Sequence, residues 1–296
     1  MSKLLLFGGS GQLGTAIQGL ADARWHIDSP SSVVANLSNV DELARLIAQS
    51  EPNIVVNGAA YTSVDEAESE PELAFQINAV APAAIAAATH KIDALFIHVS
   101  TDYLFDGMGN IPYETSAPTN PLNAYGASKL AGELAVARQN PAAIVVRTSW
   151  VHSGGGRNFV ATAVRILGSG QSMHVVDDQV GAPTSASNLA RAVLLFAEQR
   201  DASGLFHFTD SGVASWYDVA CCVLDTMREM GQVRDDVSVV PINSSLFPQA
   251  AKRPKVTLLD THTTRDRIKW TPPHWRVGVV ASTKALLGRL ARSSEK

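Results

Sequence analysis

A tyrosine and a lysine four residues apart form the pair in this sequence whose types and spacing suit proton transfer. They are Tyr125 and Lys129, within the run Asn123–Glu133. On a helix, residues at this spacing project from one face, so the phenol and the ammonium can share a small site. A phenol with a free pKa near ~10 is a poor acid or base at neutral pH, and a fixed positive charge nearby lowers its pKa. Such pairs also occur by chance on solvated helices. The rest of the chain must therefore show whether this pair is catalytic.

A second group of side chains that could do chemistry follows an apolar run. Leu95–Val99 is typical of a buried strand, and Ser100, Thr101, Asp102 and Tyr103 come directly after it. In open α/β sheets, ligands bind outside the carboxyl ends of the strands. We therefore expect these side chains to reach a substrate.

A glycine-rich turn near the N-terminus predicts a cofactor site. The apolar run Leu4–Phe7 is typical of a central parallel strand, and it leads directly into glycines at positions 8, 11 and 14 and then into a helical pattern. Such a turn lets the backbone approach a pyrophosphate, and the helix N-terminus offers free N–H groups. The sequence therefore predicts dinucleotide binding, with contacts from Gly8, Ser10, Gly11, Gln12, Leu13 and Gly14.

Two further predicted strands carry polar or small residues at their ends. Trp25–Asp28 ends in Asp28, whose carboxylate can accept hydrogen bonds from the adenosine ribose and repel a 2′-phosphate. No arginine directly follows, so the sequence favours NAD over NADP, although Asp28 could equally be a turn residue. Small residues after Ile54–Val56 let a cofactor lie against the backbone, and we expect contacts at Ala59, Ala60 and Tyr61.

Helical patterns alternate with these strands. The cap signal at residues 36–39 precedes a helix at Val40–Gln49, and Pro71–His90 is typical of a long, alanine-rich, buried helix. Asn78 is polar within that helix; it either binds a neighbouring backbone or belongs to the site. The acidic segment Asp65–Glu72 predicts a solvated face.

The alternation of strands and helices predicts an α/β fold. We expect a Rossmann-type doubly wound parallel sheet in residues 1–150, an NAD(P)-binding domain to which a helix at about 187–199 returns. Residues 151–296 would form mainly a smaller C-terminal α/β substrate-binding domain. There we expect helices and strands at 158–167, 205–208, 216–227 and 237–240, with Ser215 as a helix cap.

Composition narrows the class of protein. A chain of 296 residues with 46% hydrophobic and 18% charged residues is typical of a globular protein, and a net charge of -4 gives no footprint for nucleic acid. The apolar run in Met1–Phe7 is too short for a signal peptide or membrane span, so we expect a cytoplasmic protein without a membrane. The adjacent Cys221 and Cys222 and the scattered histidines predict no metal site and no disulfide framework.

Six motifs, in order along nearly the whole chain, resemble the dTDP-4-dehydrorhamnose reductases, a branch of the extended short-chain dehydrogenase/reductase family. They are Gly8/Gly11/Gly14, Ser100–Tyr103, Tyr125-x-x-x-Lys129, Thr148–Val151, Asp178–Thr184 and Lys252–Pro254. The glycine and Tyr-Lys motifs are shared across the superfamily, whereas the last three motifs are more specific to this branch.

The resemblance implies NADH- or NADPH-dependent reduction of the C4 ketone of a dTDP-linked 4-dehydro-6-deoxy sugar, dTDP-4-dehydrorhamnose. Tyr125 would donate a proton to the forming alkoxide, Lys129 would lower the pKa of Tyr125 and bind the nicotinamide ribose, and Thr101 would bind the carbonyl oxygen. Further cofactor contacts would come from Asn36, Leu37, Asn78, Ser100, Tyr125, Lys129 and Trp150. The substrate would contact Thr101, Asp102, Tyr103, Tyr125, Trp150, Asn158, Gln179 and Arg253, the last suited to a diphosphate by its forked donors.

The sequence also departs from the family pattern. Asn36 stands where the family often has an aspartate, which would alter the contacts with adenine. Some members join subunits through a metal held by helix carboxylates, and the matching positions here are Ala16, Ser187 and Asn188. Without carboxylates a metal-mediated dimer is not expected, and a homodimer of another kind is left open.

Two alternatives compete with the reductase. The first is another nucleotide-sugar ketoreductase, epimerase or dehydratase of the same fold; a dehydratase needs a further carboxylate, where this chain has Tyr103. The second is a non-catalytic cofactor-binding protein resembling the regulatory subunit of methionine adenosyltransferase. The intact Thr101, Tyr125 and Lys129 argue against the second alternative.

Overall fold

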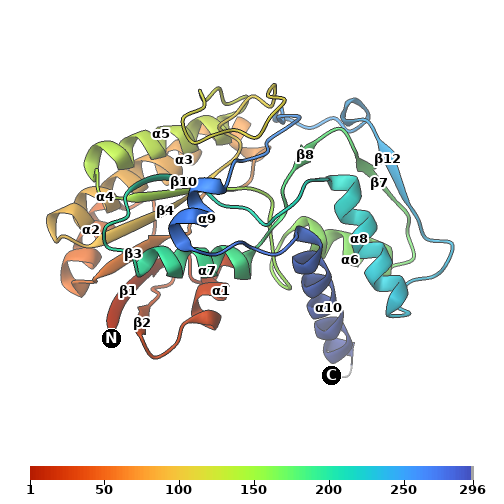
Figure 1. The fold of residues 1–296 in the computed structure, drawn as a ribbon, viewed down its shortest axis with the longest axis horizontal. Coiled ribbons are helices and arrows are strands. Elements are labelled where there is room, and N and C mark those ends of the chain that lie inside the picture. Colours follow the sequence, from red (N-terminus) through yellow and green to blue (C-terminus); the bar gives the residue numbers. More distant parts are fainter. Residues whose placement is uncertain (295–296) are drawn as a thin grey trace.

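Six parallel strands form the central sheet of this computed structural model, which describes residues 1–294 (Figure 1). Their order is β10-β5-β4-β3-β1-β2, so the chain reverses direction across the sheet between β1 and β3. The bounds are β1 Ser2–Phe7, β2 Trp25–Asp28, β3 Ile54–Asn57, β4 Leu95–Thr101, β5 Ile144–Thr148 and β10 Gly204–His207. This arrangement confirms the predicted Rossmann-type doubly wound parallel sheet.

Helices cover both faces of the sheet, as its alternating buried side chains require. Leu4 and Leu6 of β1 face one apolar cluster with α1 and α7, whereas Leu5 and Phe7 face another with α2, α4 and α5. The bounds are α1 Gln12–Leu20, α2 Val40–Ser50, α4 Ala81–Lys91, α5 Ala124–Gln139 and α7 Ala186–Ala197. The helix α7 returns to the sheet, as the sequence predicted, and packs there against α1 and β4.

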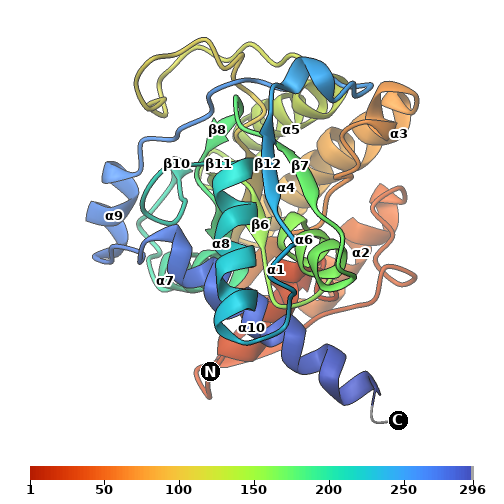
Figure 2. The ribbon, with the colours of Figure 1, turned by 90° about the vertical axis from the view of Figure 1, so that its right-hand side faces the viewer.

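A second, smaller apolar core lies beside the sheet, among α6, α8 and α10 (Figure 2). Its elements are α6 Phe159–Gly168, α8 Trp216–Glu229, α10 Trp275–Ser294 and the parallel pair β7 Met173–Val176 and β12 Val239–Ile242. Two further short strand pairs form within residues 151–215: β6 Val151–His152 with β9 Thr184–Ser185, and β8 Val180–Gly181 with β11 Ala214–Ser215. Further short elements are η1 Glu66–Glu68, η3 Ser244–Leu246 and α9 His262–Ile268.

Several predicted bounds agree closely with the structure. The strand β2 has the predicted bounds, the side chain of Asn39 caps α2, and Ser215 and Asp218 form a capping box at α8. Strand β10 joins the main sheet beside β5, so residues beyond 151 complete that sheet. The division of the chain at residue 150 therefore stays a prediction.

The predicted helix at Pro71–His90 is interrupted by a π-helical turn. It consists of α3 Pro71–Phe75, η2 Gln76–Val80 and α4. Within residues 1–294, the stretch Pro71–Lys91 alone is long and apolar enough to cross a membrane by length and composition, and half of it is buried in the protein. Core helices pass the same test, so this is weak evidence for a membrane span.

The long loop after β4, residues 104–122, lies along a segment from the C-terminal part of the chain (Figure 1). The backbone N–H of Tyr113 donates to Leu258 O at 2.7 Å, and Asp260 N–H donates to Tyr113 O at 2.8 Å. The Tyr113 ring also stacks on Phe105, with ring centroids 4.1 Å apart. These contacts hold the loop beside the carboxyl ends of the strands.

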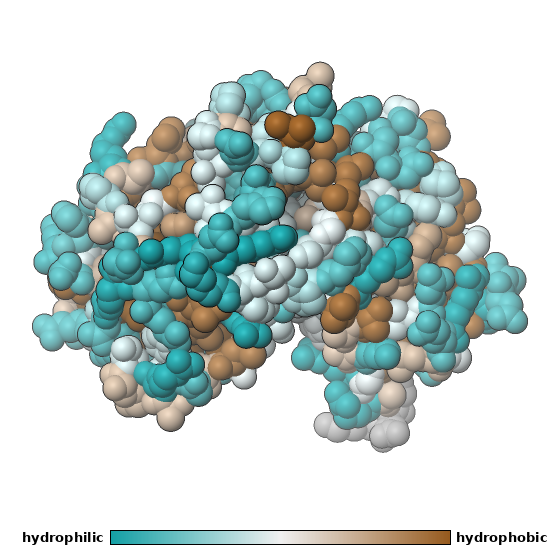
Figure 3. Space-filling view, in the orientation of Figure 1, coloured by the Kyte–Doolittle hydropathy of each residue, from teal (hydrophilic) through white to brown (hydrophobic). Residues whose placement is uncertain are grey.

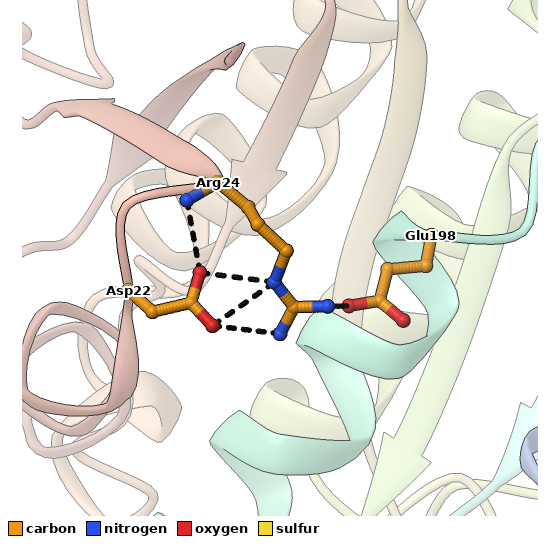
Figure 4. A network of polar contacts seen from close by, with 3 residues as sticks. All are labelled: Asp22, Arg24 and Glu198. Atoms are coloured by element: carbon orange, nitrogen blue, oxygen red, sulfur yellow. Dashed lines mark hydrogen bonds and ion pairs between the residues drawn. The ribbon is translucent and has the colours of Figure 1, made fainter.

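Ion pairs of very different burial connect elements around the sheet. On the surface, Arg24 joins Asp22 to Glu198 near the end of α7 (Figure 4). Inside, Arg147 of β5 donates to Glu133 of α5, with Nη2 2.7 Å from Oε2 and side-chain exposures of 4% and 7%.

The face seen in Figure 3 is mostly polar, with scattered apolar patches and a hollow at its lower edge between α7 and α10.

Breaking the buried pair costs far more stability than breaking the exposed pairs, because removing one partner leaves an uncompensated charge inside the protein. We expect Arg147→Met to lower the free energy of unfolding by roughly 3–5 kcal/mol. Urea unfolding followed by circular dichroism measures the loss. The matched control, Arg24→Ala, should leave the midpoint nearly unchanged, and similar midpoints for both variants would contradict the comparison.

Candidate active site

Helix α5 carries the tyrosine and the lysine, and its first turn is fixed by a side-chain cap. The Asn123 side chain accepts a hydrogen bond from Gly126 N–H at 2.7 Å and donates to Lys252 O at 2.8 Å. Tyr125 and Lys129 follow in the first two turns, and both side chains are buried. The spacing therefore places the pair inside the protein rather than on a solvated face.

Two glycines let α5 pack directly on neighbouring backbone. A Cβ at Gly132 would overlap Asn78 O of the π-helical turn, and a Cβ at Gly126 would overlap Tyr103 O after β4. Any side chain at either position would push the helix away from these contacts. Glu133 at the end of the same motif pairs with Arg147. The motif at 123–133 thus specifies packing as well as chemistry.

Asn78 contacts neighbouring backbone, which was the first of the two alternatives for it. Its Oδ1 accepts from Tyr61 N–H at 2.8 Å, and its Nδ2 donates to Tyr61 O and to Ser128 Oγ, each at 3.0 Å. These bonds join the segment after β3 to α5. Asn78 therefore sets the path of the backbone beside Ala59 and Ala60.

Tyr125, Thr101 and Asp102 come together at the carboxyl end of β4. Burial raises the pKa of Tyr125 to about 12, a hydrogen bond with Thr101 partly opposes the shift, and the Asp102 carboxylate adds to it. Burial dominates the pKa of Tyr125 in the free protein, and the expected lowering of this pKa by Lys129 stays a prediction. The phenol is consequently protonated at neutral pH, which suits a proton donor.

Asp102 is buried and held by two hydroxyl groups. Thr257 Oγ1 donates to Asp102 Oδ2, and Thr101 Oγ1 donates to Asp102 Oδ1 at 3.2 Å. Burial raises the pKa of Asp102 to about 6 against these hydrogen bonds. The carboxylate thereby fixes the Thr101 hydroxyl next to the phenol.

Lys129 extends beneath the site to the backbone of β4. Its Nζ donates to Val99 O at 2.8 Å and lies 3.5 Å from His98 Nε2. Burial lowers the pKa of Lys129 to about 8, and the nearby Glu133 carboxylate opposes this shift. Lys129 therefore has one short hydrogen bond to the backbone, and its ammonium loses a proton more readily than that of an exposed lysine.

A cavity of about 640 Å³ opens at the point where the sheet reverses direction, between β1 and β3. It is lined by Phe7, Gly8, Gly9, Ser10, Gln18, Ser29, Pro30, Ser31, Ser32, Ala35, Asn36, Leu37, Ala59, Ala60 and Ile77. Six of the predicted cofactor contacts are among them: Gly8, Ser10, Asn36, Leu37, Ala59 and Ala60. The other predicted contacts, including Asp28, do not line this cavity.

The cavity and its surroundings fit a dinucleotide. Gly8 has a φ of +87°, and a Cβ there would clash with the backbone of Ala59. Gly11 caps α1 without a side-chain hydrogen bond, so the N–H groups of Gln12 and Leu13 stay available to a phosphate, and Gly14 lies in the same first turn. These features match what a pyrophosphate requires.

Two buried hydroxyls near the carboxyl ends of β4 and β5 have no hydrogen-bond partner within residues 1–294. They are Ser100 Oγ and Thr148 Oγ1. A buried polar atom without a partner carries a desolvation cost, which a bound ligand can relieve. Ser100 was predicted as a cofactor contact, whereas Thr148 was not.

Trp150 lies at the end of β5 in an unusual backbone conformation. Its φ is +47°, which is uncommon for a residue other than glycine, and its indole stacks on Trp216 with centroids 3.6 Å apart. Gly181 packs directly against the indole, where a Cβ would clash. The ring is thus held between β8 and α8, at the junction of the two parts of the chain.

Arg253 forms a paired contact that the sequence did not predict. Its Nη1 and Nη2 bind Asp65 Oδ1 and Oδ2 at 3.0 and 2.7 Å, a bidentate ion pair. In the same acidic segment, Glu68 accepts from Ala124 N–H and Glu70 accepts from the Tyr61 hydroxyl. The acidic segment is largely exposed, as predicted, and three of its carboxylates also hold the loops around α5.

Gln12 and Asn158, predicted separately as cofactor and substrate contacts, bind each other. Asn158 Nδ2 donates to Gln12 Oε1 at 2.8 Å, and Ser153 Oγ donates to the same oxygen at 2.9 Å. Asn158 also caps α6. The contact connects the glycine turn to the C-terminal part.

Gln179, also predicted as a substrate contact, is buried in the loop before β8.

Sequence reasoning missed three residues of this region. Thr257 holds Asp102, Asp65 holds Arg253, and Trp216 stacks on Trp150. Each contact joins segments that are far apart in the chain, so no local spacing could have found it.

Within residues 1–294 no group of three or more His, Cys, Asp or Glu could hold a metal ion. At one of the positions compared with the metal-binding relatives, the Asn188 side chain donates to Asp210.

The fold and the site together define a protein of the short-chain dehydrogenase/reductase class, with a glycine turn at the switch point and a buried Tyr-x-x-x-Lys pair beside β4. The chain belongs to the dTDP-4-dehydrorhamnose reductase family, because residues 2–287 match the family described as RmlD substrate binding domain. The resemblance inferred from six motifs is thereby confirmed.

Individual relatives support this family membership. The chain is 37% identical to the dTDP-4-dehydrorhamnose reductase of Burkholderia thailandensis, over 97% of this chain and 100% of the relative. It is 36% identical to the Salmonella typhimurium enzyme of the same name, over 94% of this chain and 95% of the relative. The crystal structure of the Bacillus anthracis dTDP-4-dehydrorhamnose reductase in complex with NADP has a TM-score of 0.87 at 30% identity, covering 94% of this chain and 97% of that one.

The three hydrogen bonds of Asn78 make a specific prediction for cofactor binding. Asn78→Ala should release the backbone of Tyr61, weaken dinucleotide affinity several-fold and lower the free energy of unfolding by roughly 1–3 kcal/mol, since buried groups lose their partners. Isothermal titration with NADPH and urea unfolding measure the two effects. Gln76→Ala, two residues earlier on the same turn, is the control. Unchanged affinity in Asn78→Ala would contradict the assigned role.

Proposed function

We propose that this protein reduces the C4 ketone of dTDP-4-dehydrorhamnose to give dTDP-L-rhamnose, using NADH or NADPH, in nucleotide-sugar and polysaccharide biosynthesis. The observation that carries the proposal is the buried group of Thr101, Tyr125 and Lys129 at the end of β4, in a chain of this reductase family. The names of the full-length relatives support the substrate.

The site residues divide the work of ketone reduction. When bound, the reduced nicotinamide supplies the hydride to C4. Tyr125, whose phenol is protonated at neutral pH, gives its proton to the developing alkoxide. The Thr101 hydroxyl has a single proton, which it donates to Asp102 in the free protein and would turn toward the same alkoxide oxygen when the substrate is bound. Asp102 orients Thr101. Burial of this group excludes water and strengthens these interactions.

Lys129 is the residue suited to the nicotinamide ribose. Its ammonium has one short hydrogen bond, to Val99 O, and retains further N–H donors for ribose hydroxyls. In the free protein burial outweighs any effect of Lys129 on the pKa of Tyr125, so we assign Lys129 to cofactor binding first. Ser100 and Asn78 support the same region, the former with its unpartnered hydroxyl and the latter by holding the Tyr61 backbone.

Trp150, Gln179 and Arg253 are proposed to contact the nucleotide sugar, together with Tyr103 and Asn158. The stacked Trp150 offers a rigid apolar surface, and Arg253 offers a guanidinium that Asp65 holds in one orientation. Because Nη1 also donates to Ala251 O at 3.1 Å, the N–H groups of Nε and Nη2 are the ones proposed to bind a diphosphate. Arg253→Lys would lose this orientation as well as the fork.

The cofactor cavity is compatible with either dinucleotide. Ser29, Ser31 and Ser32 line it directly after β2, and their hydroxyls can hydrogen-bond a ribose hydroxyl or a 2′-phosphate. The sequence favoured NAD because of Asp28, while the Bacillus anthracis relative was crystallised with NADP. The preference for NAD over NADP stays a prediction.

The decisive assay measures cofactor consumption with purified dTDP-4-dehydrorhamnose. A reductase oxidises one NADH or NADPH for each sugar reduced, and the product has a C4 hydroxyl with the stereochemistry of rhamnose by NMR. An epimerase returns its cofactor unchanged, and a regulatory subunit binds cofactor without reducing the ketone. Either of these results would overturn the proposal in favour of the corresponding alternative.

Tyr125→Phe tests the proton donor. The variant keeps the ring but loses the acid, so we expect kcat to fall by about 10²–10⁴-fold with little change in cofactor affinity. Steady-state kinetics and NADPH titration measure both quantities. Tyr217→Phe on α8, the same exchange outside the site, should keep normal turnover. Near-normal turnover of Tyr125→Phe would remove Tyr125 from its assigned role.

The oligomeric state is proposed to be independent of divalent metal. The helix positions that hold a metal in some relatives are Ala16, Ser187 and Asn188 here, and the Asn188 side chain is already bound to Asp210. A homodimer and a cytoplasmic location are kept as proposals. Light scattering after size exclusion should give one mass with Mg²⁺ and with EDTA, and dissociation by EDTA would contradict this expectation.

A further inference from the structure

A buried chain of polar side chains runs beneath Lys129, and the site chemistry described above does not use it. Asn57 at the end of β3 and His98 on β4 are paired in the sheet register, and neither is exposed. Asn57 Nδ2 lies 3.2 Å from His98 Nδ1, and His98 Nε2 lies 3.5 Å from Lys129 Nζ. The three side chains thus connect the sheet to the helix that carries the catalytic pair.

The hydrogen-bond pattern fixes the direction of this chain. Asn57 Oδ1 accepts from Ala59 N–H at 3.1 Å, so the Asn57 amide must present its NH₂ group to His98. His98 Nδ1 is therefore the acceptor. Burial first, and the Lys129 charge second, hold the pKa of His98 well below 6.5, so the ring is neutral. A neutral imidazole with Nδ1 as acceptor has its proton on Nε2.

The His98 Nε2–H consequently points at Lys129 Nζ. An uncharged amine has a lone pair that accepts this proton while its own N–H donates to Val99 O. An ammonium has no lone pair, and the Nε2–H dipole opposes its charge. The other charged or titratable groups on the packed elements are Tyr125 and Glu133 on α5, with Glu133 paired to Arg147 of β5, and the exposed Arg138 in the last turn of α5.

We propose that His98 is a positioning residue for Lys129: its Nε2–H favours the uncharged amine in the free protein, so that Lys129 takes up a proton when a cofactor ribose supplies hydroxyl acceptors. The inference rests on the proposed function for the site that Lys129 serves. It adds a consequence, namely that dinucleotide affinity is linked to proton uptake and weakens as pH rises through the pKa of the free lysine.

The sign of this linkage follows from the free and bound states. The pKa of Lys129 is lowered to about 8 in the free protein, chiefly by burial, and bound ribose hydroxyls raise it because they accept hydrogen bonds from the ammonium. Near pH 8 about half of the free molecules must gain a proton on binding. Well below that pH the lysine is already charged, and uptake disappears.

The tautomer of His98 is tested directly by NMR of the unliganded protein. With ¹⁵N-labelled histidine at pH 7, long-range ¹H–¹⁵N correlations should show His98 neutral with its proton on Nε2, the resonance being assigned by its loss in His98→Gln. An Nδ1–H tautomer or an imidazolium would overturn the proposal. This measurement uses the wild-type fold, so it does not depend on the stability of a variant.

The linkage is tested by calorimetric titration with NADPH at pH 8 in buffers of different ionisation enthalpy. The wild type should take up about half a proton. In His98→Gln the amide oxygen can accept from the ammonium, so uptake should fall and its midpoint should move upward by about one pH unit. His152→Gln, at a buried histidine that contacts Ser282 rather than α5, should keep normal uptake.

Unchanged uptake in His98→Gln, or none in the wild type, would overturn the role of His98. These readouts need no turnover. A protein that binds NADPH with the expected proton uptake but fails to reduce the ketone would overturn the proposed function and leave the role of His98 intact.

Discussion

The contact of α5 with the end of β4 is the constraint on which the rest of this structure depends. Lys129 is only 1% exposed, although burying an ammonium is costly, and its Nζ reaches just far enough to bind Val99 O. This geometry requires the helix to lie against neighbouring backbone, which Gly126 and Gly132 permit. Moving α5 outward would expose the lysine and separate Tyr125 from Thr101.

The remaining elements serve this contact by bringing strand ends together. The parallel sheet places the ends of β1, β3, β4 and β5 on one edge, with the cofactor cavity at the reversal between β1 and β3. The C-terminal part adds side chains that cross to that edge: Thr257 on Asp102, Arg253 on Asp65, and Trp216 on Trp150. The reacting group and the nucleotide pocket are therefore built by different parts of the chain.

Much of the sheet half could be predicted from sequence, because its signals are local. Strand β2, the cap of α2 and the caps of α6 and α8 follow from a few neighbouring residues. The helices α9 and α10 were not foreseen, and in α10 apolar residues lie on several faces while two glycines weaken its helix propensity. The short strands β6, β8, β9 and β11 exist only through pairing with distant segments.

The chemistry of the site could be predicted in type but not in its energetics. Residue types and spacing identified Tyr125, Lys129 and Thr101, whereas the direction of the Tyr125 pKa shift depends on burial, which spacing does not reveal. The partner of Arg253 and the alignment of Asn57 with His98 likewise arise from strand register and tertiary packing. Burial thus decides which charges the site holds before any ligand is bound.

The most direct measurement of the central claim follows a label from cofactor to sugar. The protein is supplied with dTDP-4-dehydrorhamnose and nicotinamide cofactor deuterated at C4 on each face in turn. Our account predicts one deuterium at C4 of the sugar from one of the two faces, with the new hydroxyl proton coming from solvent through Tyr125. A reduced sugar without deuterium from either face, or deuterated cofactor recovered unchanged, would contradict it.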